Sequence, residues 1–163
     1  MKKALTLLLA MATIFFLISC GNNELSDNSG IDIVINDSSF KGNQQIDNNN
    51  YCVFINEYSE LTEFLSENDL EFAWSYDQVK YNKEFFNKNS IIINHYVYGH
   101  LGYELTYDLK VNGEMLLLTI TVIEEEKKAY PTAVDIGFRI IEIKKDDIVG
   151  IMDFSYEINY ERR

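Results

Sequence analysis

The stretch that decides the fold is Leu101–Ile123, which reads LGYELTYDLKVNGEMLLLTITVI. On both sides of Asn112-Gly113, apolar or aromatic side chains mostly alternate with polar ones, which is the period-two pattern of a strand with one buried face. An Asn-Gly pair between two such runs is a strong signal for a two-residue hairpin turn. With this turn Leu109 lies opposite Leu116, and the apolar side chains of both strands fall on one face. The stretch therefore predicts an antiparallel hairpin that buries one side.

Further strands are expected before and after this hairpin. The apolar or alternating runs that predict them are Ile31–Ile35, Tyr51–Ile55, Ile91–Tyr98, Ala133–Ile143 and Met152–Tyr160. The last of these runs is expected to form a second hairpin with Ala133–Ile143.

Helical patterns are short and lie before the hairpin. Ser59–Glu67 has apolar residues at helical spacing, with Ser59 as its expected cap, and Phe85-Phe86 indicates another helical turn. Together the patterns predict an α+β fold, namely a mainly antiparallel sheet of five or six strands with one or two short N-terminal helices.

The composition is that of one globular domain with an acidic surface. The 163 residues are 47% hydrophobic and 13% aromatic, which is enough for a sizeable core. The formal net charge of −12 disfavours nucleic acid and anionic lipid head groups as partners, because like charges repel. Trp74 and Tyr76, in a less regular stretch, are expected to be core or lid aromatics.

The N-terminus has the order of parts of an export signal. Lys2-Lys3 precedes the mostly apolar run Leu5–Ile18, which is shorter than the roughly 20 residues that a membrane-spanning helix needs. Leu17-Ile18-Ser19-Cys20 then resembles a bacterial lipobox. The resemblance implies cleavage before Cys20, lipidation of Cys20, and anchoring of the protein to a membrane of the bacterial cell envelope. More than one acyl chain makes such anchoring stable.

These observations divide the chain into three parts. Residues 1–19 are expected to be a lipoprotein signal peptide, and residues 20–50 a flexible tether with one possible short strand at 31–35. Residues 51–163 are expected to form the globular α+β domain. Composition leaves open whether the folded part begins near Ile31 or near Tyr51.

The chain has two cysteines, Cys20 and Cys52. If Cys20 is lipidated, Cys52 has no disulfide partner although export would permit a disulfide. Within the apolar run Tyr51–Ile55, Cys52 is expected to be a small buried hydrophobe.

The two histidines, His95 and His100, are the first candidates for a metal site or for acid–base catalysis. They could share a metal ion with Glu104 or Asp108, but a catalytic zinc site needs three protein ligands on one face. The hairpin pattern places these two acids on the face opposite the buried one. The sequence also contains no serine-hydrolase elbow, phosphate-binding glycine loop or calcium loop. We therefore expect no metal, no cofactor and no enzymatic activity.

Four stretches of the chain resemble one known family. They are VFINEYSELTEFL at 53–65, YNKEFFNKNSIIIN at 81–94, YGHLGYELTYDLKVNGEMLLLTITVIE at 98–124 and YPTAVDIGFRIIEIKKDDI at 130–148. In this order they resemble the PrcB-type protease-complex subunit family, whose members are typically lipoproteins or exported proteins. Gly102-Tyr103 matches the Gly-Tyr of the family's hairpin turn. The resemblance implies a non-enzymatic accessory that stabilises or assembles a protease complex at the cell surface.

Tyrosines concentrate near the turn Gly99–Gly102, where they could contact a partner. Tyr98, His100 and Tyr103 are the best candidates for such contacts. The function expected first is a lipid-anchored, non-catalytic envelope domain that binds or stabilises another exported protein, possibly a protease complex. A loop-based protease inhibitor that uses Gly99–Gly102 is the alternative, and a hydrolase with an unrecognised site is a lesser one.

Overall fold

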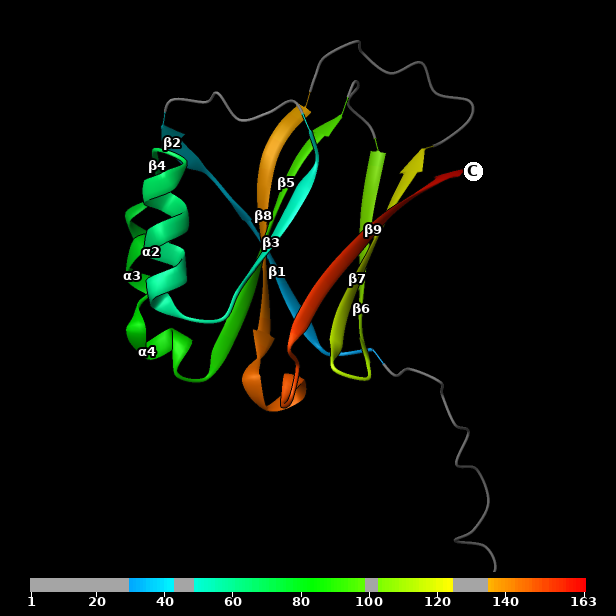
Figure 1. Cartoon of the computed structure of the whole chain (residues 1–163). Coiled ribbons are helices and arrows are strands. Elements are labelled where there is room, and N and C mark those ends of the chain that lie inside the picture. The colour runs from blue at the N-terminus through cyan, green and yellow to red at the C-terminus, as the bar shows by residue number, and fades with distance from the viewer. Residues whose placement is uncertain (1–29, 43–48, 99–102, 125–134) are drawn as a thin grey trace, which may run out of the picture.

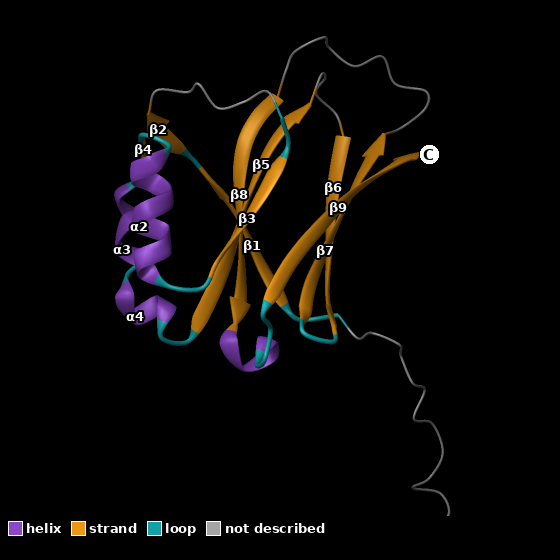
Figure 2. Cartoon of the chain, in the orientation of Figure 1, coloured by secondary structure: helices purple, strands orange, loops and turns teal. Residues whose placement is uncertain are grey.

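Two β-sheets pack face to face, and helices cover the outer face of the larger sheet (Figure 1, Figure 2). The computed structural model describes residues 30–42, 49–98, 103–124 and 135–163. In order, their elements are β1 (Ile33–Ser38), β2 (Phe40–Gly42), β3 (Tyr51–Ile55), α2 (Tyr58–Glu67), β4 (Leu70–Phe72), α3 (Ser75–Lys80), α4 (Lys83–Phe86), β5 (Asn89–Tyr98), β6 (Tyr103–Asn112), β7 (Met115–Glu124), β8 (Asp135–Lys144), the 3-10 helix η1 (Lys145–Ile148) and β9 (Asp153–Arg162). The α+β class is confirmed, with nine strands in the described residues where the pattern predicts five or six.

The layers follow from the strand order. The larger sheet has the order β1-β8-β5-β3 and is antiparallel throughout. The smaller sheet has the order β6-β7-β9, and β2 pairs with β4 in a separate two-stranded ribbon. Helices, four-stranded sheet and three-stranded sheet therefore lie in that order across the molecule (Figure 2).

Strand β5 lies at the centre and is covered on both faces. Ile91, Ile92 and Ile93 are completely buried. Because successive side chains of a strand point to opposite faces, Ile91 and Ile93 join the core beneath the helices, whereas Ile92 joins the core between the sheets. A strand with two buried faces reads as a continuous apolar run, which explains why this triplet lacks the period of two.

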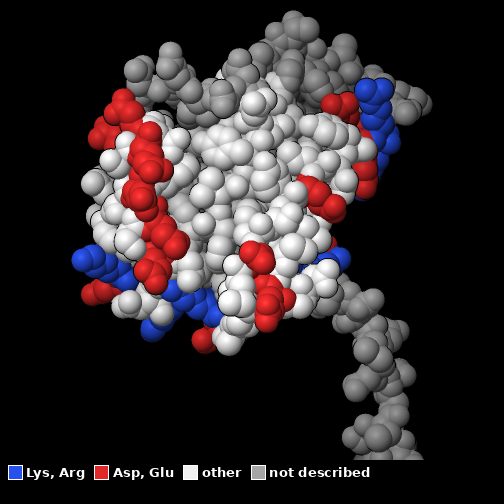
Figure 3. Space-filling view, in the orientation of Figure 1, with Lys and Arg blue, Asp and Glu red and all other residues white. Residues whose placement is uncertain are grey.

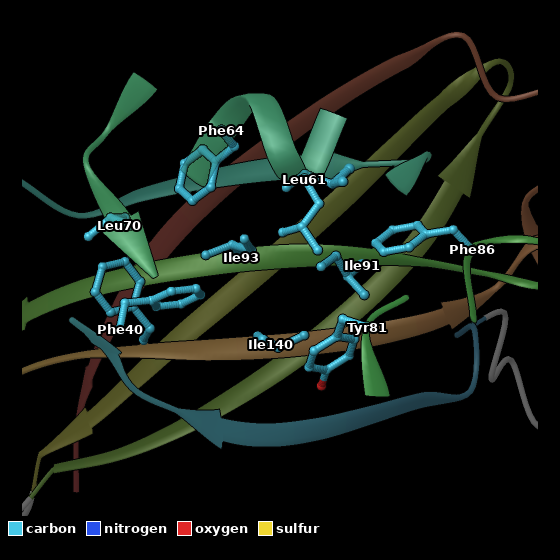
Figure 4. Close-up of a cluster of buried hydrophobic side chains, with 11 residues drawn as sticks. Phe40, Leu61, Phe64, Leu70, Tyr81, Phe86, Ile91, Ile93 and Ile140 are labelled. Carbon is cyan, nitrogen blue, oxygen red and sulfur yellow. The ribbon is translucent and has the colours of Figure 1, made fainter. Parts of the chain in front are cut away.

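The core beneath the helices is rich in aromatic rings (Figure 4). Its buried members are Phe40, Ile55, Leu61, Phe64, Leu70, Tyr81, Phe86, Ile91, Ile93, Phe138 and Ile140. The Phe40 ring stacks on Phe72 with centroids 5.0 Å apart and meets Phe138 edge-on at 4.7 Å. These contacts join the β2–β4 ribbon to the four-stranded sheet.

The core between the sheets is aliphatic. Its buried members are Ile92, Leu109, Leu116, Leu118, Ile120, Ile141, Ile143 and Ile148. The face of the hairpin that the alternation predicts to be buried is thus the face that packs on the four-stranded sheet.

The hairpin turn lies one residue later than predicted. Asn112 pairs with Met115, so Gly113 and Glu114 form the turn, and Leu109 lies opposite Leu118 rather than Leu116. Gly113 has a φ of +65°, and a positive φ at the first central residue alone is the pattern of a type II′ turn, which favours glycine there. The register therefore moves by two residues, and a shift of two keeps every side chain on its predicted face.

The N-terminal cap of α2 also differs from the prediction. The helix begins at Tyr58, and its N-cap is Glu57 rather than Ser59. The Glu60 carboxylate reaches back to accept a hydrogen bond from the Glu57 N–H at 3.1 Å, as in a capping box. Leu61 and Phe64 are buried, as the helical spacing predicts.

The last strand does not form a hairpin with the strand before it. β9 runs parallel to β7 in the three-stranded sheet, with Leu118 opposite Tyr156. Between β8 and β9 the chain passes through η1 and crosses to the other sheet, where the Met152 N–H donates to the Glu114 carbonyl at 2.8 Å. The prediction of a hairpin was wrong because alternation shows which face a strand buries but not which strand lies beside it.

The strand expected at Ile31–Ile35 belongs to the packed sheet. β1 pairs with β8 from Ile33 to Ser38, and the Ile31 N–H donates to the Leu109 carbonyl at 3.0 Å. Of the two possible starts of the folded part, the structure therefore supports the one near Ile31. This part of the predicted tether is a strand of the domain.

Candidate binding surface

Of the three residues predicted to contact a partner, Tyr98 lies inside the domain. Its side chain is 7% exposed, and its ring centroid is 4.4 Å from that of the half-buried Tyr103. Burial raises the pKa of the Tyr98 hydroxyl. His100 lies outside the described residues. Tyr98 therefore packs inside the domain, and its ring is not available to a partner.

A polar network around Arg139 joins the two sheets. The Arg139 Nε donates to Asp37 at 3.0 Å, and its Nη1 lies 3.4 Å from the Tyr107 hydroxyl. The Tyr107 hydroxyl in turn donates to the Asn94 side-chain carbonyl at 3.0 Å. The guanidinium lies 5.7 Å from the ring centroids of both Tyr96 and Tyr107, within range of a cation–π contact. These bonds connect β1, β8 and β5 of the larger sheet with β6 of the smaller one, so the network holds the two sheets together.

The histidine that the structure describes is a packing residue. His95 is almost completely buried, its Nδ1 lies 3.0 Å from the Asn49 carbonyl, and its ring stacks on Tyr51. Burial lowers the pKa of His95, so its imidazole is neutral near pH 7. Glu104 and Asp108 lie on the outer face of the other sheet. No group of three or more His, Cys, Asp and Glu side chains among the described residues could hold a metal ion.

Cys52 is half-buried rather than fully buried, and it packs against the core between the sheets. The Asn94 side-chain amide donates to the Cys52 Sγ at 3.4 Å. Burial raises the pKa of the thiol to about 12, with a smaller opposite effect of Asn94. Because the thiolate is the reactive form, this environment does not activate a nucleophile.

We expect alkylation of Cys52 by iodoacetamide at about pH 8 to be at least about 100-fold slower than alkylation of free cysteine, whose thiol has a pKa near 8.5. The rate should rise with pH up to about 12, the pKa of the buried thiol. Mass spectrometry of the Cys20→Ser protein measures this one thiol, and the same protein in urea is the control. A folded-state rate close to that of free cysteine would contradict the assigned environment.

Helix α3 presents its polar side inward and its apolar side to solvent. Trp74, which caps the helix, is 63% exposed, and Tyr76 and Val79 are 70% and 71% exposed. Asp77 is buried instead. Surface helices of globular proteins normally show the opposite arrangement. Of the two expectations for Trp74 and Tyr76, core or lid aromatics, the core position is therefore wrong. We call Trp74, Tyr76 and Val79 the α3 surface.

Polar contacts on the inner side of α3 explain this inversion. Asp77 accepts a hydrogen bond from the Ser38 hydroxyl at 3.0 Å, and Lys80 forms an ion pair with Glu142 of β8. The Glu142 carboxylate also accepts from the Tyr81 hydroxyl at 2.9 Å and from the Asn36 amide at 2.6 Å. These contacts fix the rotation of the short helix about its axis with the polar side toward the sheet. The apolar side chains therefore point to solvent.

The α3 surface continues onto the edge of the four-stranded sheet. β1 has β8 on one side and, among the described residues, no strand on the other. The exposed side chain of Val34 lies at this edge on the face that carries α3, opposite Glu142 of β8, whereas that of its exposed neighbour Ile35 points to the other face of the sheet. The Ser39 carbonyl next to β1 accepts from the Ala73 N–H at 2.8 Å, which places Trp74 beside the strand. Exposed aromatic and aliphatic side chains that gather in this way mark interaction sites.

A sequence signal for this surface existed but was misleading. Trp74 is the only tryptophan of the chain, and tryptophan side chains are highly buried on average. The spacing of Asp77 and Lys80, which lie three apart on one helical face, would have indicated a polar face. Nothing in the sequence states that this polar face points inward.

None of the helices in the described part of the chain is long and apolar enough to cross a membrane. Comparisons of the chain with protein-family models, with curated proteins and with solved structures find no match.

Proposed function

We propose that this chain is a non-catalytic, lipid-anchored domain of the bacterial cell envelope that binds another exported protein through the α3 surface. The observation that carries the proposal is the inverted helix α3, which exposes Trp74, Tyr76 and Val79 on a rigid support. Tryptophan and tyrosine are enriched among the residues that dominate protein–protein binding energy.

The chemistry of the surface favours a protein as the partner. Its exposed side chains are apolar or aromatic, while the chain as a whole carries a formal net charge of −12. Nucleic acid and anionic membranes are repelled by such a charge. An apolar patch within an acidic surface fits a protein with a complementary apolar patch and a basic or neutral rim.

The lipobox supports the location, because lipidation of Cys20 would hold the domain at a membrane beside other exported proteins. The resemblance to the PrcB-type family supports a protease complex as the bound partner. In that role the domain would stabilise or position a neighbouring protein, without chemistry of its own.

Site-specific photo-crosslinking in membranes of the native host tests this proposal. A benzophenone side chain at Tyr76 is expected to give one discrete adduct with another exported protein, and the same group at the exposed Glu63 of α2 is the matched control. Trp74→Ser in the Tyr76 crosslinking chain should reduce the adduct by about tenfold or more, the effect of losing a dominant interface residue. Identical adducts from positions 76 and 63, or none from position 76, would refute binding through the α3 surface.

The anchor is tested in the same membranes. Cys20→Ser is expected to abolish labelling of the protein by a radioactive fatty acid. Equal labelling of the Cys20→Ser protein would contradict lipid anchoring at Cys20 without bearing on the α3 surface.

A further inference from the structure

Strand β9 is an open edge of the three-stranded sheet. In the described part of the chain it has β7 on one side and no strand on the other. The sheet that it belongs to has three strands, and the sheet that it packs against has four.

The hydrogen-bonding groups of β9 that face this open edge can be assigned. The backbone N–H groups of Asp153 and Arg163 donate to the carbonyls of Glu114 and Glu124, at the two ends of β7. In a strand the direction of the backbone groups alternates with each residue, and in a parallel pair the N–H and C=O of one residue point to the same neighbour. The even-numbered residues from Phe154 to Arg162 therefore direct both groups away from β7.

The inner face of β9 is apolar but incompletely covered. Phe154 packs on Phe54 of β3 with ring centroids 5.8 Å apart at the start of the strand. Further along, Tyr156 is 36% exposed and Tyr160 is 64% exposed, although both are opposite core residues of β7. Figure 1 shows β9 and β3 close together near this start and increasingly apart toward the C-terminus. An added strand beside β9 would cover these two tyrosines.

The outer face of β9 is acidic at regular intervals. Asp153, Glu157 and Glu161 point to the side opposite Phe154 and Tyr156, and each is exposed. Glu157 accepts a hydrogen bond from the Thr119 hydroxyl at 3.0 Å, and Glu161 pairs with Arg163. Figure 3 shows acidic atoms at intervals along the side where β9 runs in Figure 1.

We propose that the open edge of β9 accepts an extended segment of another protein as an added strand, in which basic and apolar side chains alternate. The backbone of the segment would bond to the even-numbered residues of β9, as in other cases of strand addition. Its basic side chains would lie beside Asp153, Glu157 and Glu161, because opposite charges on neighbouring strands stabilise the pairing. Its apolar side chains would lie against Tyr156 and Tyr160.

Two other occupants fit less well. A second copy of β9, in the antiparallel pairing centred on Glu157, would place this residue opposite its own equivalent, and like charges on adjacent strands destabilise the pair. The segment of this chain at 21–29 contains Glu24 and Asp27 but no lysine or arginine. The acidic spacing therefore favours a basic segment from a different protein. This inference does not rest on the α3 surface, which lies on another element.

Binding of synthetic peptides to the full lipidated chain in detergent tests the proposal. The probe is a fluorescent ten-residue peptide of alternating lysine and valine, with a glutamate–valine peptide as its counterpart, and anisotropy measures binding. The lysine–valine peptide is expected to bind at least about tenfold more tightly. N-methylation of every second amide, on the edge that meets β9, should weaken it by about tenfold or more, since strand addition depends on these N–H groups.

Charge reversal gives the decisive comparison. In the chain with Asp153→Lys, Glu157→Lys and Glu161→Lys, the preference should invert toward the glutamate–valine peptide, a result that unfolding cannot mimic. If circular dichroism shows that this chain does not fold, Glu157→Gln replaces it and should weaken lysine–valine binding about two- to fivefold. Trp74→Ser should leave peptide binding unchanged, which separates this site from the α3 surface.

Three results of the peptide assay would overturn the proposal. They are no binding of the lysine–valine peptide, binding that N-methylation does not weaken, and binding that neither charge substitution alters. The second and third would indicate general attraction of a basic peptide to an acidic protein. A change in sedimentation that shows dimers of the chain through β9 would assign the edge to a second copy instead.

Discussion

Replacing Ile92 by alanine is expected to lower the free energy of unfolding by about 3–4 kcal/mol, because it leaves a cavity between the two sheets. Ile92 is completely buried in the central strand β5, where it packs with Leu109, Leu118 and Ile141. Neighbours fixed in two hydrogen-bonded sheets cannot move far enough to fill the space. Urea denaturation followed by circular dichroism measures the change.

Ile136→Ala is the matched control for this substitution. Ile136 lies in the neighbouring strand β8 but is 50% exposed, so its removal should lower the free energy of unfolding by less than about 1 kcal/mol. Equal losses for Ile92→Ala and Ile136→Ala would mean that the two sheets do not pack on each other around β5.

Stability is expected to fall steeply between about pH 9 and pH 12, because phenol and thiol groups that lose their protons readily when unfolded keep them when folded. Burial raises the pKa of Tyr107 and of Cys52 to about 12, and raises that of Tyr98 as well. When folding raises the pKa of a neutral acid, the unfolded chain binds fewer protons than the folded chain at pH values above the pKa of the group in the unfolded chain. Stability from such a group is complete below the unfolded pKa and is lost as the pH rises toward the folded one.

The size of the effect follows from Tyr107, whose pKa rises from 10.0 to about 12. This shift corresponds to a loss on the order of 2 kcal/mol by about pH 12. Urea midpoints measured from about pH 8 to pH 12, together with the ultraviolet absorbance of tyrosinate, follow the loss and assign it to ionisation.

Tyr107→Phe is the variant that isolates this contribution. It removes the hydrogen bond to Asn94 and the contact with Arg139, so we expect a loss of about 1 kcal/mol near pH 8. It should also make the decline above pH 10 shallower, since one ionising group is absent. An unchanged slope would show that Tyr107 does not ionise in the unfolding transition.

The two proposed surfaces differ in how the domain holds them. The α3 surface is an apolar patch on a helix that polar contacts of Asp77 and Lys80 fix against the sheet. The β9 edge offers backbone groups flanked by acidic side chains. A partner could therefore use the first for affinity through burial of aromatic rings and the second for orientation, because strand pairing sets a register.

The alternation of apolar and polar residues was enough to predict the long strands and the faces that they bury, but not the three-residue strands β2 and β4. Alternation identified β6, β7, β8 and β9, and helical spacing identified the buried side of α2. A side chain's place on the inner or outer face follows from the period of two, so it remained correct even though the hairpin register moved by two residues.

Which elements distant in the sequence are neighbours, and which face of α3 points inward, could be learned only from the folded structure. The pairing of β9 with β7 depends on the crossing of the chain through η1, and β1 joins β8 over about a hundred intervening residues. The outward direction of Trp74 and Tyr76 depends on Ser38 and Glu142, which are far from α3 in sequence. The spacing of residues along the chain shows whether one face of a helix or strand is polar or apolar. Whether that face is buried depends on contacts with residues that are distant in the sequence.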